Sequence, residues 1–192
     1  MAFAMGLWLP ANAQQPVDYV NPIIGTNGMG HTFPGACTPF GLVQLSPDTD
    51  TIPHNVNGAY QKKTYEYCAG YQYQDQTIVG FSHTHLSGTG HSDLGDILLM
   101  PAVGEVKLNP GRALHPQEGY RSRFSHATEK ATPGYYEVML DDYGIKAQLT
   151  ATQRTGIHKY TFPKDQNGHL ILDLVHGIYN YDGKVLWSNL RV

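Results

Sequence analysis

Apolar and polar residues alternate with a period of two in several short stretches, the pattern of β-strands with one buried face. The clearest stretch is residues 145–150, in which Ile, Ala and Leu alternate with Lys, Gln and Thr. Residues 97–100 form an apolar run suited to burial. The patterns predict strands or extended segments at residues 40–48, 70–75, 77–81, 102–108, 121–126, 135–140, 145–150, 156–162 and 169–174.

Turn-forming residues separate these stretches, and signals for helices are scarce. Residues 141–144, with sequence DDYG, predict a tight hairpin connection. Residues 129–134 and 163–168 predict further turns, and residues 109–119 predict a loop. Short strands at regular spacing indicate an all-β fold, either an antiparallel sandwich or a barrel.

The two ends of the chain differ from the rest. Residues 1–13 read as the remnant of an export signal, because an apolar run precedes the Ala11-Asn12-Ala13 cleavage pattern. A disordered apolar tail is the alternative. Residues 17–192 then form one β domain, and residues 186–192 end it on an apparently unfinished strand. We therefore expect a fragment of a longer protein.

Composition narrows the functional classes. The 192 residues carry a net charge of −3, only 15% are charged, and no run of like charges occurs. This balance gives no electrostatic case for binding nucleic acid or a membrane surface. The two cysteines, Cys37 and Cys68, are either bonded or free, and their spacing does not decide between these states.

Histidines and carboxylates gather in residues 81–100. His83 and His85 lie two apart, so both project from one face of an extended chain. The flexible turn 87–90 follows, and then His91, Asp93 and Asp96. This composition fits either the lining of a polar site or a buried hydrogen-bonded network. A zinc or iron site built from His83, His85, His91 and Asp93 is a further alternative.

A second glycine-rich segment lies near the N-terminus. Gly25, Gly28 and Gly30 resemble a dinucleotide loop, but no helical pattern follows them. The favoured interpretation is a loop that presents backbone N–H groups and His31 to a polar ligand.

The segments that carry these features resemble glycoside hydrolase family 92, the exo-acting α-mannosidases. The resemblance lies in residues 19–26, 30–36, 39–48, 80–100, 129–136 and 149–152. It covers nearly the whole chain after Val17, although residues 51–69 show no clear match. One departure from the resemblance is His91, because many relatives are expected to have a small residue or a cysteine at this position.

The resemblance implies an N-terminal β-sandwich followed by a C-terminal (α/α)6 barrel, in an exported bacterial enzyme that is periplasmic or secreted. It implies calcium-dependent removal of α-mannose with inversion. In the family, the calcium site and the acid and base carboxylates belong to the barrel, so we expect no catalytic residue, cofactor or metal on this chain. Asp93 and Asp96 are expected to be structural, because an inverting pair stands about 6.5–9.5 Å apart around a water.

Neutral donors and acceptors suit the hydroxyl groups of a sugar. The substrate-binding residues that we predict come from two loops, Gly28 and His31 in the first, and His83, His85, Gly88 and Thr89 in the second. Tyr71 and Tyr73 are expected in the core, with sugar stacking as the alternative. The expected partners are mannose-containing glycans and the barrel domain. A free-standing carbohydrate-binding or interaction module is the second hypothesis.

Overall fold

A computed structural model describes residues 14–50, 55–178 and 184–191. The predicted export signal at residues 1–13 lies outside the described residues. The described 3-10 helices and strands are η1 (Pro16–Tyr19), β1 (Ala36–Cys37), β2 (Gln44–Asp48), β3 (Asn55–Val56), β4 (Ala59–Tyr60), η2 (Lys62–Tyr67), β5 (Thr77–Ile78), β6 (Gly80–Ser82), β7 (Leu98–Val103), η3 (Pro116–Glu118), β8 (Ser122–Arg123), β9 (Lys130–Thr132), β10 (Tyr135–Leu140), β11 (Ile145–Ala151), β12 (Gly156–Thr161) and β13 (Gly168–Asp173).

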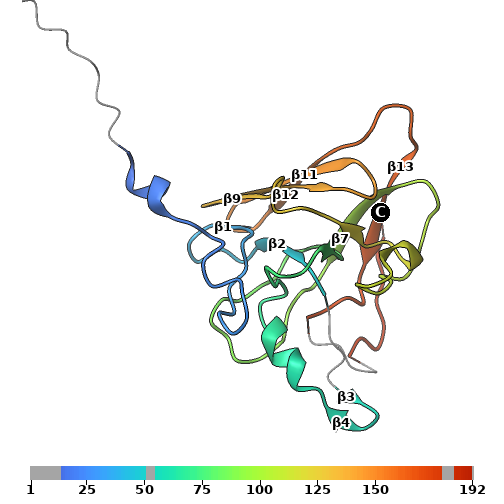
Figure 1. The fold of residues 1–192 in the computed structure, drawn as a ribbon, viewed down its shortest axis with the longest axis horizontal. Helices are drawn as coiled ribbons and strands as arrows, with labels where there is room; N and C mark the ends of the chain where they lie inside the picture. Colours follow the sequence, from blue (N-terminus) through green and yellow to red (C-terminus); the bar gives the residue numbers. More distant parts are fainter. Residues whose placement is uncertain (1–13, 51–54, 179–183, 192) are drawn as a thin grey trace, which may run out of the picture.

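Two antiparallel sheets form the body of the molecule. One has the strand order β1-β2-β6-β7-β13 and the other β12-β11-β10-β9. β11 contacts β1 and β2 across the interface, and Figure 1 shows β9, β11 and β12 lying over β1, β2 and β7. The described part of the chain is therefore an all-β antiparallel sandwich, which confirms the predicted fold class. No helix in that part is long and apolar enough to span a membrane.

The alternating pattern builds the core. In β11, buried and half-buried residues alternate along the whole strand, and β10 has the complementary pattern. Tyr136, Val138 and Leu149 thereby meet Phe81 and Met100 of the other sheet in one apolar cluster. Burying such a side chain contributes about 1.5–3 kcal/mol to stability. The alternating sequence of β10 and β11 therefore determines which face of these strands is buried.

Several predicted elements are confirmed by the register of the strands. Leu140 pairs with Ile145, so residues 141–144 form the expected hairpin connection, and Gly144 supplies its positive φ of 61°. The strands predicted at 135–140, 145–150, 156–162 and 169–174 are β10, β11, β12 and β13 to within one or two residues at each end. Residues 98–100 of the predicted apolar run 97–100 open β7, whereas Ile97 precedes the strand and is 49% exposed.

The strand predicted at residues 70–75 is wrong, because this segment is a turn without strand pairing. Gly70 has a φ of +79°, and a Cβ there would lie 2.3 Å from Asp48 Oδ1. The alternation of aromatic and polar residues has another cause. Tyr71 is buried and its hydroxyl donates to Glu129 at 2.9 Å, while the buried Gln72 bonds the backbone of Gly28.

Five other boundaries were also wrong. The strand predicted at 40–48 begins only at Gln44. The strand predicted at 102–108 ends at Val103, because Gly104 (φ 84°) turns the chain where pairing with β13 stops. Residues 130–132 form β9 against β10, so the turn predicted at 129–134 is confined to its last residues. The predicted extended segment 121–126 contains only the two-residue strand β8. An unfinished strand was expected at residues 186–192, but its described part, residues 186–191, contains no strand.

Candidate functional site: the loop end of the sandwich

The two glycine-bearing loops singled out in the sequence meet at one end of the sandwich. The Gly88 N–H donates to the carbonyl oxygen of His31 at 2.7 Å. The first loop is closed on itself, because the Thr32 N–H donates to the Gly25 carbonyl at 3.3 Å. Gly30 is obligatory at this crossing, since a Cβ there would lie 2.1 Å from the Gly25 oxygen. The structure therefore joins residues 25–32 to residues 83–89.

His31 lies at this junction with an unused polar atom. Its side chain packs edge-on against Tyr65, with ring centroids 4.7 Å apart. The residue is 8% exposed, and its Nε2 is buried with no hydrogen-bond partner within the described residues. An unpaired buried polar atom costs about 1–3 kcal/mol. His31 also has a φ of 52°, a strained value for a residue other than glycine. Both features are typical of a residue held in place for a ligand.

Gly28 and Thr89 flank this junction. The Gly28 N–H and carbonyl are both bonded by the Gln72 side-chain amide, at 2.9 and 3.0 Å, so its backbone groups are occupied. No atom lies within 4 Å of the position a Gly28 Cβ would take. Gly28 thus offers open space to a ligand and not an N–H group. The Thr89 hydroxyl accepts from the His91 N–H at 3.2 Å and donates to the His91 carbonyl at 3.3 Å, and the residue is half-buried.

His85 lies under the loops and is fully buried. Its Nδ1–H donates to the Gln44 carbonyl at 2.8 Å, and its Nε2–H donates to Asp48 Oδ1 at 2.8 Å. Both ring nitrogens therefore face acceptor oxygens. Asp48 also accepts from Ser82 at 2.6 Å and from His176 at 2.7 Å. Asp48, Ser82, His85 and His176 together form the Asp48 cluster.

The Asp48 cluster is a buried ion pair that ties three segments together. Burial alone would raise the pKa of Asp48, but the positive charge of His85 and the hydrogen bonds from His176 and His85 lower that pKa well below its ordinary value. The carboxylate therefore stays charged and links β2, the start of the histidine stretch and the segment after β13.

His83 turns in a different direction from His85. Its Nδ1–H donates to the Ile97 carbonyl at 2.6 Å, and its Nε2 lies 3.1 Å from Nε2 of His158 on β12. Burial is the main cause that lowers the pKa of both rings, to about 4 for His158. His85 lowers the pKa of His83 further, and His83 lowers that of His158 further. Both imidazoles are thus neutral at pH 7. The Tyr160 hydroxyl then donates to His158 Nδ1 at 2.7 Å, which completes a hydrogen-bonded chain between the two sheets.

The other polar residues of the histidine stretch are not gathered into a metal centre. No group of three or more His, Cys, Asp or Glu side chains in the described ranges is arranged to hold an ion. The alternative zinc or iron site of His83, His85, His91 and Asp93 is therefore not assembled. Asp96 is exposed and accepts from the Thr84 hydroxyl at 2.9 Å. The thiols of Cys37 and Cys68 are both free.

The two tyrosines considered for sugar stacking have different surroundings. Tyr71 is 1% exposed and belongs to the core. Tyr73 stacks on the His126 ring, with centroids 3.9 Å apart and an interplanar angle of 13°. The expected core position is thus confirmed for Tyr71 and wrong for Tyr73, which is 37% exposed with one ring face covered by His126.

An exposed apolar surface borders the site. Phe40 is fully exposed with a φ of 56°, and Leu42 is 71% exposed. With Gly41, Gln153 and Arg154 they line an open hollow of about 570 Å³. The Leu42 N–H donates to the Gln153 carbonyl at 2.7 Å, which holds the two sides of the hollow together. The Gln44 N–H donates to the His83 carbonyl at 2.9 Å, so this surface is continuous with the histidine stretch. An exposed aromatic ring on strained backbone is typical of a contact surface.

Sequence reasoning missed the partners that organise the site. Asp48 lies within a segment that resembled the family, yet nothing in its neighbours marks it as buried. His176 is 128 residues away from Asp48 in the sequence, and His158 is 75 residues away from His83. The only signal was the alternation in residues 156–162, which places His158 and Tyr160 on one face of a strand.

Comparison with known proteins places the chain in a family. Residues 19–192 match the model of the glycosyl hydrolase family 92 N-terminal domain. A family GH92 α-mannosidase of Bacteroides thetaiotaomicron, solved in complex with mannoimidazole, is similar with 47% identity and a TM-score of 0.76, over 85% of this chain and 20% of that one. An inverting mannosidase of the same family and species is similar with 28% identity and a TM-score of 0.62, over 84% of this chain and 20% of that one.

A relative outside the solved structures agrees with this assignment. An uncharacterized secreted glycosidase of Arthroderma benhamiae is 30% identical over 161 residues, which are 82% of this chain and 19% of the relative. The chain thus spans about a fifth of the length of the proteins it matches. The resemblance found in the sequence is confirmed: the chain belongs to glycosyl hydrolase family 92 and corresponds to the N-terminal domain of its mannosidases.

Proposed function

We propose that this chain forms one wall of the sugar pocket of an exported, inverting exo-α-mannosidase, with the acid and base supplied by a C-terminal domain. The observation that carries the proposal is His31, whose unpaired Nε2 is buried where the two loops meet. Hydroxyl groups of a terminal mannose are matched partners for this nitrogen and for the Thr89 hydroxyl. The name of the secreted relative supports export.

The predicted sugar contacts have two different roles in this proposal. His31, Gly88 and Thr89 contact the sugar, and Gly28 leaves room for it. His83 and His85 position the second loop, because their ring nitrogens are engaged with protein groups in the described residues. Direct contact of these two rings with the sugar, which the sequence also predicted, would require those hydrogen bonds to be replaced.

The exposed surface of Phe40 and Leu42 supports a second domain beside this wall. Inversion needs an acid and a base on opposite sides of the scissile bond with a water between them, about 6.5–9.5 Å apart. Calcium prefers oxygen ligands, and the described residues do not assemble a cluster that fits it. We propose that calcium, like the carboxylates, is bound by the C-terminal domain.

The test is a His31→Ala variant of the full-length polypeptide, assayed for mannose release from an α-mannoside. Loss of one hydrogen bond to the sugar should lower kcat/KM about tenfold. The melting temperature should change little, because the lost ring contact with Tyr65 is offset by removal of the buried, unpaired Nε2. His115→Ala, an exposed histidine in a distant loop, is the control. An unchanged kcat/KM in His31→Ala, or equal losses in both variants, would refute the assignment.

A further inference from the structure

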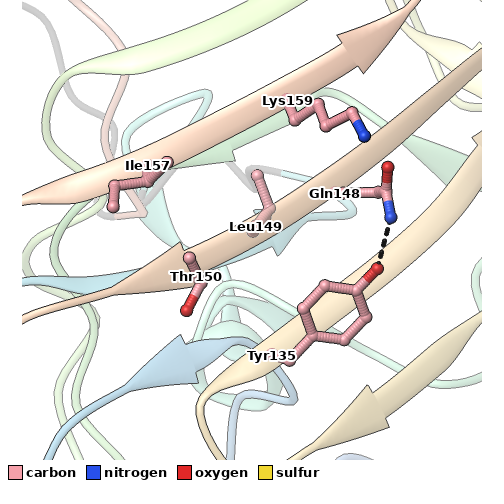
Figure 2. Close-up of a pocket in the computed structure, with 6 residues that line it drawn as sticks. All are labelled: Tyr135, Gln148, Leu149, Thr150, Ile157 and Lys159. Carbon is pink, nitrogen blue, oxygen red and sulfur yellow. Dashed lines mark hydrogen bonds between the residues drawn. The ribbon is translucent and has the colours of Figure 1, made fainter.

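The outer face of the second sheet carries a hollow that is separate from the loop end. Figure 2 shows its lining on β10, β11 and β12, with the residues Tyr135, Gln148, Leu149, Thr150, Ile157 and Lys159. The volume of the hollow is about 210 Å³, which suits a single monosaccharide-sized group. Its position on the outside of the sandwich leaves it open to solvent in this chain.

The aromatic ring in this hollow is held rigidly. The Tyr135 hydroxyl donates to the Glu137 carboxylate and accepts from Gln148 Nε2 at 2.6 Å. Glu137 in turn pairs with Lys146 at 3.1 Å, so its charge is balanced. A ring fixed by two hydrogen bonds loses little conformational entropy when a ligand stacks on it. The hollow therefore contains a preorganised aromatic surface.

The neighbouring surface is apolar. The Thr150 hydroxyl donates to the Gly134 carbonyl at 2.8 Å and is thereby engaged with the backbone. Ile157 is 48% exposed beside it. Tyr135 and Ile157 thus offer carbon atoms to the C–H face of a ligand.

A donor and an acceptor stand at the edge of this apolar surface. Gln148 uses its Nε2 for Tyr135, which leaves its Oε1 as an acceptor. Within the part of the chain that the structure describes, no hydrogen bond or ion pair engages the Lys159 ammonium. Figure 2 shows the end of the Lys159 side chain beside the Gln148 amide. This pair can bind two adjacent hydroxyl groups, because each hydroxyl both donates and accepts.

We propose that this face binds a pyranose ring of an α-mannan chain, as a second sugar site distinct from the loop end. A pyranose has an apolar C–H face for Tyr135 and Ile157, and vicinal hydroxyls for Gln148 and Lys159. A charged peptide fits less well, because the Lys146–Glu137 pair leaves one unpaired charge at the rim. The site holds the polysaccharide and takes no part in the cleavage step. The choice of α-mannan rests on the proposed function, but binding at this site is tested separately from the pocket wall.

The test uses the 192-residue chain and two probes. In an NMR titration with methyl α-mannopyranoside, amide shifts of residues 135, 148–150 and 157–159 should change. In affinity electrophoresis with α-mannan in the gel, Tyr135→Ala should weaken retardation about tenfold. Lys159→Gln should also weaken it, whereas Lys164→Gln, an exposed lysine in the turn before β13, should not. Tyr135→Phe keeps the ring and should retain most of the binding.

Three outcomes would overturn the proposal. The first is the absence of amide shifts on the outer face, whether no amide shifts at all or only those of residues 28–31 and 83–89 do. The second is equal mannan retardation in Lys159→Gln and Lys164→Gln, a comparison that holds even if Tyr135→Ala fails to fold. The third is a concentration-dependent dimer whose dilution moves the same amides, which would mean that a second copy covers this face. His31→Ala should leave the amide shifts of the outer face unchanged. The proposed role of His31 in the sugar pocket is tested separately, by mannose release from the full-length enzyme.

Discussion

Asp48→Asn tests whether the buried ion pair holds the loop end together. The carboxylate accepts three hydrogen bonds, from His85, His176 and Ser82, at 2.6–2.8 Å. An amide in its place removes the charge and turns an N–H group toward another donor. Breaking a buried charge pair from one side costs about 3–5 kcal/mol. We expect a loss of about 4 kcal/mol from a free energy of unfolding of about 5–15 kcal/mol.

Urea unfolding at pH 7, followed by circular dichroism, measures this loss. With an m-value of about 2 kcal/mol per M, the midpoint should fall by about 2 M. The control is Asp96→Asn, because Asp96 is exposed and bonds only the neighbouring loop at Thr84. Its midpoint should change by less than about 0.5 M. A change as small as this in Asp48→Asn would refute the structural role of the cluster.

The pH dependence of the same comparison gives a second check. The pKa of Asp48 is depressed in the folded protein, so its contribution to stability is fully present above the unfolded-state value of about 3.9. That contribution is lost as the pH falls below this value and the carboxylate takes up a proton. The difference between wild type and Asp48→Asn should therefore be constant from pH 5 to 7 and shrink below about pH 4. A difference that grows on acidification would contradict this.

Two further predictions concern single residues of the same scaffold. The pKa of His158 is lowered to about 4, so the unfolded state binds more protons between pH 6.5 and 4, and stability should fall as the pH drops through this window, by roughly 3 kcal/mol at most. In urea titrations, His158→Gln should reduce this slope and leave the part due to His83, whose pKa is also lowered. An unchanged slope would refute the neutral chain of imidazoles. Gly70→Ala places a Cβ 2.3 Å from Asp48 Oδ1 at a φ of +79°, and should lower the free energy of unfolding by at least about 2 kcal/mol. The control Gly58→Ala, which has a similar φ but open space around the Cβ, should lower it by about 1 kcal/mol. Equal losses in the two variants would contradict the steric argument.

The sequence predicted the sheet interior well, because a strand with one buried face must alternate. Residues 145–150 had to place Ile145, Ala147 and Leu149 on one side, and the hairpin at 141–144 fixed their pairing with β10. The same rule failed at residues 70–75. There, Tyr71 and Gln72 are buried by specific hydrogen bonds and not by strand pairing. Period-two alternation does not distinguish the two causes.

The candidate site was predicted only in part. The two loops were recognised from glycine, histidine and threonine content, and the structure joins them between His31 and Gly88. The different environments of His83 and His85 were not predictable, because they depend on His158 and on Asp48 with His176, which are far away in the sequence. Long-range pairing of this kind is set by the sheet topology, which local patterns do not specify.

The central claim is that this domain shapes the sugar pocket while another domain supplies the acid and base. The most direct measurement is mannose release from an α-mannoside by the purified 192-residue chain, compared with an intact relative under the same conditions with calcium present. The account predicts no release above the uncatalysed rate by the chain alone, and activity only when the C-terminal domain is part of the same polypeptide. Release by the isolated chain at a rate comparable to the intact enzyme would contradict it.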